Sequence, residues 1–179
     1  MLKIILGAIV TVFAVIGGFI FLDKGKTIVN GGGDGGGDSS TTNSYIIEGD
    51  VVSPGTYKIK GSNVTMNDLI EAAGGLKSTA DERSYNSTVE LTSGSTYFIG
   101  SRFDASDVCN INELAKVNIN TDDADTLTTV TGFTNSIASS IVSYRYENGN
   151  FTTIEGLLDV YGIGNATYRK VRNYVILHE

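Results

Sequence analysis

A short glycine-centred pattern occurs twice near the end of the chain, thirty residues apart. The first copy is Val130-Thr131-Gly132-Phe133-Thr134-Asn135, and the second is Val160-Tyr161-Gly162-Ile163-Gly164-Asn165. An apolar-periodic run follows each turn, which predicts a short helix, a tight turn and a second helix. Amides at the start of a helix have no partner within it, so such a turn suits a phosphate and does not read base sequence.

Basic side chains gather on the helix that is expected after the second turn. Arg169, Lys170 and Arg172 lie there, and no acidic residue occurs between that turn and the penultimate position. The first turn differs, because residues 126–144 contain no charged residue and Arg145 is the first one beyond it. We therefore expect lopsided anion binding that is stronger at the second copy.

The overall charge opposes nucleic-acid binding by bulk electrostatics. The chain carries 13 Lys and Arg against 20 Asp and Glu, a net charge of −7, whereas proteins that coat nucleic acid are basic. Any phosphate binding must therefore depend on local geometry. With about three to five phosphates engaged, log K would fall against log salt with a slope of roughly −3 to −4.5.

Residues for catalysis or metal binding are scarce. The single histidine, His178, lies next to the C-terminus, and the single cysteine, Cys109, is expected to be a small apolar side chain in a connector. No Cys/His cluster, nucleophile elbow or P-loop occurs. We expect no catalytic residue, metal or cofactor, and no enzymatic activity.

The N-terminus predicts a membrane anchor over residues 1–23. Residues 4–22 are apolar and uncharged, and at about 1.5 Å per residue they nearly span a hydrocarbon core of about 30 Å. The alternatives are a cleaved signal peptide, which would need a small-residue cleavage site after the run, and a buried helix. Basic residues flanking the run favour, by one charge, the orientation with the rest of the chain inside. A Gly/Ser-rich tract at residues 30–44 follows, and residues 24–44 are expected to form a flexible tether. The fifteen residues of the tract give a reach of about 20 Å.

Residues 45–101 predict a small mixed domain. The expected order is a strand over 46–52, a type II turn over 53–56, a strand over 57–60, a helix over 68–73 and a closing strand near 97–99. Thr65 or Asn67 is expected to cap the helix. The segments Glu48–Tyr57 and Leu69–Leu76 resemble the soluble-ligand-binding β-grasp family.

A connector over residues 102–115 precedes a predicted helical domain at residues 116–179. Thr121 is expected to cap its first helix, and Thr152 and Glu155 to form a capping box for the third. Neither copy of the pattern can bury its apolar stripe alone, so the two are expected to pack about a pseudo-twofold axis with both turns on one side. The fold class is α+β multidomain: an N-terminal transmembrane helix, a small β-grasp-like domain and an all-α tandem helix-hairpin-helix domain.

The helical domain, with Val117–Thr121, Gly132–Thr134, Ile141–Phe151 and Leu157–Gly164, resembles that of ComEA-type competence proteins. The order of anchor, tether, β-grasp module and helix-hairpin-helix domain is also that of this family. The resemblance implies a membrane-anchored, single-pass receptor with its C-terminal domains outside the cell membrane. Such a receptor binds double-stranded DNA without sequence specificity for uptake during transformation, with a DNA transport channel as a further partner. The DNA-binding residues that it implies are Gly132, Phe133, Thr134, Asn135, Arg145, Gly162, Ile163, Gly164, Asn165, Arg169, Lys170 and Arg172.

Two features depart from the family pattern. Thr134 stands where a second glycine is usual, and it would be strained if that position needs a positive φ. The basic residue that often follows the first turn is missing.

Tyr144, Tyr161, Tyr168 and Tyr174 are expected in the core or at its rim rather than stacked on bases. The alternative function is a surface structural or interaction protein, in which the β-grasp module self-associates or binds envelope glycan and the helical domain is a scaffold.

Overall fold

The computed structural model describes residues 42–104 and 112–179, which belong to one compact unit. The expected anchor, nearly all of the expected tether and Cys109 lie outside the described residues. No helix within 42–104 and 112–179 is long and apolar enough to cross a membrane.

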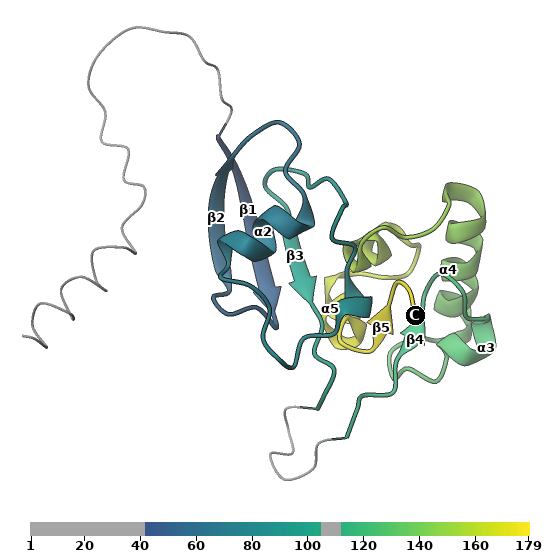
Figure 1. Cartoon of the computed structure of the whole chain (residues 1–179). Coiled ribbons are helices and arrows are strands. Elements are labelled where there is room, and N and C mark those ends of the chain that lie inside the picture. Colours follow the sequence, from purple (N-terminus) through teal and green to yellow (C-terminus); the bar gives the residue numbers. More distant parts are fainter. Residues whose placement is uncertain (1–41, 105–111) are drawn as a thin grey trace, which may run out of the picture. The chain divides into compact units, whose positions relative to one another are not determined.

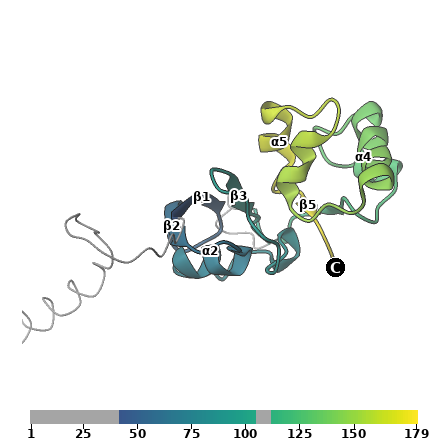
Figure 2. The ribbon, with the colours of Figure 1, turned by 90° about the horizontal axis from the view of Figure 1, so that it is seen from above.

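The first module is a three-stranded sheet with one helix across a face (Figure 1). Strand β1 (Thr42–Gly49) pairs antiparallel with β2 (Gly55–Lys60) and parallel with β3 (Thr96–Ile99), so the order is β2-β1-β3. Helix α2 (Met66–Ala72) lies in the crossover that carries the chain from β2 to the far side of β1, as a parallel pairing requires. Figure 2 shows α2 on one side of the three strands.

Local signals set the ends of these elements. Thr65 caps α2 in a capping box with Asp68, which confirms one of the two expected caps. The expected type II turn is wrong: Gly55 has no positive φ and begins β2. The glycine of this segment with a positive φ is instead Gly49, the last residue of β1, whose φ is +89° and where a Cβ would collide with the carbonyl of Ile99.

The second module contains both copies of the repeated pattern. The first copy comprises α3 (Ala124–Leu127) and α4 (Asn135–Asn148), and the second comprises the 3-10 helix η2 (Ile154–Asp159) and α5 (Asn165–Val171). Figure 2 shows α4 and α5 with the chain that connects them, which includes η2, between them. Side chains from both copies form one core, as expected; its fully buried members include Leu127, Ile141, Ile154, Leu157 and Val171.

Three expectations for this module are wrong. It is not all-α, because β4 (Val117–Asn118) and β5 (Val175–Ile176) pair in parallel and join its two ends. Asp123 rather than Thr121 caps α3, and its side chain accepts from the amide of Thr126. Thr153 is the N-cap of η2 and makes no side-chain cap, so the expected capping box does not form.

A buried ion cluster joins the two modules. Asp81 is 0% exposed; its carboxylate accepts from Arg83 Nε at 2.9 Å and lies 2.9 Å from the ammonium of Lys116. Burial alone would raise the pKa of Asp81, but Arg83 and Lys116 outweigh it and hold that pKa well below its usual range. The ionised carboxylate therefore fixes the start of the second module to the first.

Asp81→Asn should destabilise the protein by about 3 kcal/mol at pH 7, because the charge of Lys116 stays buried without its counter-ion. A carboxyl with a lowered folded pKa contributes stability above its unfolded pKa of about 4 and loses it as the pH falls further. The gap between wild type and variant should hence shrink below about pH 4. Urea unfolding from pH 7 to pH 3 measures this, with the exposed Glu71→Gln as control; an equal gap at both ends would contradict the ionised pair.

Candidate nucleic-acid interface

The two glycine turns have the same local structure. Gly132 has a φ of +130° and Gly162 a φ of +92°. In each turn the next amide bonds back to the preceding valine carbonyl, from Phe133 at 3.0 Å and from Ile163 at 3.1 Å. Phe133 and Ile163 are both 5% exposed and anchor their turns in the common core. The sequence repeat is therefore a structural repeat.

The position after each anchor begins a helix and has an ordinary backbone. Thr134 has a φ of −85° and Gly164 a φ of −97°. Thr134 is thus unstrained, contrary to the concern raised by its sequence position, and its hydroxyl caps α4 by accepting from the amide of Ile137. Gly164 offers no side-chain cap, so the first amides of α5 lack that partner. Gly164 and Asn165 are exposed, and these amides remain open to a ligand.

Each turn lies against a helix of the other copy. A Cβ built on Gly132 would come within 2.8 Å of Val171 and 3.4 Å of Lys170 on α5, and one built on Gly162 would lie 3.5 Å from Ile137 at the start of α4. This crossed packing is the arrangement expected of two repeats related by a pseudo-twofold axis. Each turn therefore packs against the helix that follows the other turn.

The four cations implied by the resemblance fall into two groups. Arg145 donates to the carbonyls of Ile119 at 2.8 Å and Asp122 at 2.6 Å, and so braces the module internally. Arg172 pairs with Glu48 at 2.7 Å and stacks 4.0 Å over the ring of Phe98. Arg169 and Lys170 are exposed and form no ion pair within the described part of the chain.

Glu155 joins the second copy to the sheet of the first module. Its carboxylate accepts from the amide of Phe98 and from the hydroxyl of Tyr168, both at 2.8 Å. Burial raises the pKa of Glu155, and the hydrogen bond from Tyr168 opposes that shift. The sequence pattern assigned this residue to a helix cap, and no local signal pointed to a partner in β3.

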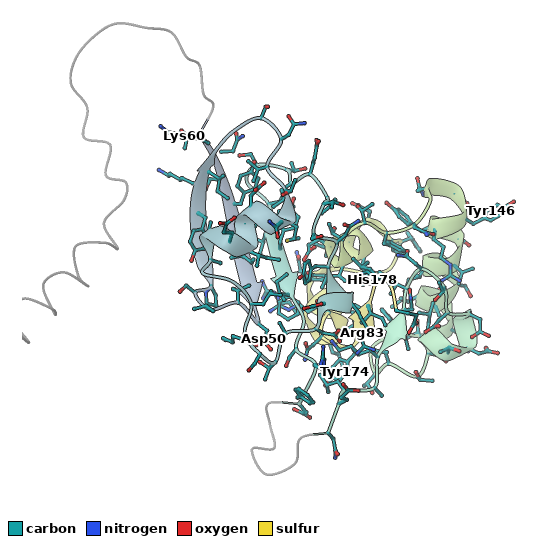
Figure 3. The ribbon with its side chains drawn as sticks, viewed as in Figure 1. Asp50, Lys60, Arg83, Tyr146, Tyr174 and His178 are labelled. Atoms are coloured by element: carbon teal, nitrogen blue, oxygen red, sulfur yellow. The ribbon has the colours of Figure 1, made fainter. Side chains whose placement is uncertain are left out.

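The tyrosines of the second module divide between core and solvent. Tyr168 is 7% exposed, and Tyr144 stacks on Phe151 with ring centroids 5.0 Å apart. Tyr161 is 87% exposed at the tip of the second turn, so its expected place in the core or rim is wrong. Tyr146, which sequence reasoning did not select, is 90% exposed and points away from α4 (Figure 3).

The residues that the structure describes contain no group of three or more His, Cys, Asp or Glu placed to hold a metal ion. His178 lies at the junction, where a ring nitrogen is 3.1 Å from the carbonyl of Tyr85.

The fold and the repeated turns define a helix-hairpin-helix protein with an attached β-grasp module, and family models agree. The helix-hairpin-helix motif matches residues 112–176, and the SLBB domain matches residues 43–124. ComE operon protein 1 of Bacillus subtilis (strain 168) is 32% identical over 138 residues, which are 72% of this chain and 67% of that protein. The chain belongs to the ComEA-type competence protein family, a family of competence proteins rather than of enzymes.

Two further relatives match shorter segments. An uncharacterized protein of Haemophilus influenzae is 45% identical over 62 residues, 34% of this chain and 55% of that protein. Endonuclease/exonuclease/phosphatase family domain-containing protein 1 of Bos taurus is 42% identical over 60 residues, only 10% of its own length. The Bacillus protein therefore matches 72% of this chain, whereas each of these two relatives matches about a third of it.

Thr134→Ala should lower the free energy of unfolding by about 1 kcal/mol, because α4 loses its side-chain cap. Thr134→Gly should cost only a few tenths, and Thr134→Ser should match wild type. Urea unfolding of the three variants measures these differences. A Thr134→Gly variant clearly more stable than wild type would mean that threonine is strained at this position.

Proposed function

We propose that this chain is a membrane-anchored, extracytoplasmic receptor that grips double-stranded DNA by its phosphate backbone, without sequence specificity, for uptake in transformation. The observation that carries this proposal is the crossed packing of the two glycine turns. It places the turn at Gly132 against Val171 and Lys170 of α5, and the turn at Gly162 against Ile137 of α4, while Gly162 and Gly164 stay exposed. Two neighbouring turns of this kind can meet phosphates on two strands across a groove.

Positive charge on the second copy supports the proposal that the surface around the two turns binds DNA. Arg169 and Lys170 follow the second turn on α5 and are exposed, whereas Arg145 and Arg172 are held by internal partners. Phosphate contacts of this type hold a protein on the duplex and carry no sequence information directly. The available cations also revise the expected salt dependence: about two or three phosphates give a slope of roughly −2 to −3.

Family membership supplies the biological setting of the proposal. The Bacillus relative is named for the ComE operon. As stated for the resemblance, ComEA-type proteins are membrane-anchored receptors that bind double-stranded DNA during transformation. The apolar run at residues 4–22 would anchor the chain, and the tract at 24–44 would hold the two modules close to the membrane surface. A DNA transport channel is the partner that this role requires.

Arg169→Ala with Lys170→Ala should weaken duplex binding at least tenfold near 100 mM salt and make the slope shallower by about 2, roughly 0.9 for each lost phosphate contact. Fluorescence anisotropy with a 20-base-pair duplex measures both, on the full-length chain in mild detergent. Lys58→Ala with Lys60→Ala, exposed on β2, is the matched control and should stay within twofold of wild type.

A second duplex of unrelated sequence should bind with the same affinity within about threefold. Absence of wild-type binding even at low salt, or equal losses in the two double variants, would contradict the proposed receptor.

A second candidate keeps one observation in its favour. Two of the four implied cations, Arg145 and Arg172, bind partners inside the protein and are not free to contact a ligand. A scaffold role predicts such internal contacts. In that case the helical module positions the β-grasp module for self-association or for an envelope glycan. The double variants decide between the two functions, because a scaffold would leave duplex binding absent or insensitive to Arg169 and Lys170.

A further inference from the structure

Given that the chain binds duplex DNA as proposed above, we infer that Lys170 supplies the missing cation of the first turn, across the repeat. Lys170 and Thr131 would form a second phosphodiester site, separate from the one that Arg169 and the second turn provide. The sequence gives residues 126–144 no charge at all, so a cation for the first turn has to come from elsewhere in the fold.

The stem of Lys170 lies directly on the first turn. A Cβ on Gly132 would be 3.4 Å from Lys170 Cδ and 3.7 Å from Lys170 Cγ. The bare glycine therefore leaves room for the aliphatic part of the side chain. Long basic side chains bury such stems along a surface and keep the charged end in water, so the ammonium is expected to emerge beside the turn at Gly132.

A hollow next to this turn offers matching chemistry. Its volume is about 450 Å³ and its lining is Ala115, Thr129, Val130, Thr131, Lys170 and Tyr174. The hydroxyl of Thr129 already donates to the carbonyl of Thr126 at 2.7 Å. Thr131 and Tyr174 are exposed and carry hydroxyl groups that can donate to an anion, and none of the described residues that line the hollow is a carboxylate. One ammonium and two hydroxyls suit a phosphodiester.

Arg169 and Lys170 point to different places because successive helical residues are about 100° apart. Arg169 lines a second hollow of about 360 Å³ with Asn165, at the start of α5, and with the carboxylates Glu48 and Glu155. Lys170 lines the hollow at the first turn. The two neighbouring cations would therefore meet different phosphates, and the Lys170 site would hold the second strand of the duplex.

The test compares a 20-base-pair duplex with a 20-nucleotide single strand, by anisotropy on the full-length chain in mild detergent. Lys170→Met keeps an apolar stem on Gly132 and removes the charge. It should weaken duplex binding about five- to tenfold, reduce the salt slope by about 1, and change single-strand binding less than twofold. Arg169→Met should weaken both DNAs alike, and Lys170→Arg should retain duplex affinity.

A double-mutant cycle checks the shared site. Thr131→Val should lose little further affinity in the Lys170→Met background, whereas its effect should add fully to that of Arg169→Met. Two results would contradict the site of Lys170 and Thr131 while wild type still binds the duplex. One is equal coupling of Thr131 to Arg169 and Lys170, and the other is an equal effect of Lys170→Met on both DNAs. Either result would leave the proposed receptor function intact. If wild type binds no duplex, both fail.

Discussion

The close approach of Gly132 to α5 of the opposite repeat is the constraint on which this structure depends. Each turn needs a positive φ, and at Gly132 a Cβ would also press on Val171 at 2.8 Å. Residues with side chains adopt such a backbone only at a cost. Because Gly132 carries no side chain, the repeats can pack closely enough for Phe133 and Ile163 to enter one core. The same crossing sets each turn against the helix that follows the other turn, although the two turns are thirty residues apart in the sequence.

The four implied cations of the helical module fall into two groups, one that binds partners inside the protein and one that is free for the proposed DNA contact. Arg145 satisfies backbone carbonyls of the first repeat, and Arg172 joins Glu48 and Phe98 of the sheet module. Glu155 and the pair of Asp81 with Lys116 tie the same modules together through buried polar contacts. Arg169 and Lys170 alone among the four implied cations face solvent without a partner in the described ranges. A chain of net charge −7 would thus rely on a few well-placed donors rather than on a basic surface.

Patterns confined to a few neighbouring residues predicted part of this fold, although the type II turn at Gly55 and the cap at Thr121 were wrong. The glycine turns, the cap at Thr65 and the strand order up to α2 follow from local signals, and all are present in the structure. Long-range partners were not predictable in the same way. Thr152 and Glu155 have the spacing of a capping box, yet the Glu155 carboxylate binds the amide of Phe98 because η2 packs against β3. Arg172 looked like a DNA ligand because its carboxylate partner, Glu48, is 124 residues away. Thr134 looked strained because its backbone angle could not be read from sequence; it is an ordinary helix cap.

The central claim is that the two turns act as one surface for the sugar-phosphate backbone, and amide chemical shifts test it most directly. A short duplex titrated into the ¹⁵N-labelled full-length chain should perturb the amides of both turns, with the largest changes at residues 131–135 and 162–166, and should leave β1 and β2 unchanged. Perturbations confined to the sheet, or to one turn while the other stays silent at saturation, would contradict the account.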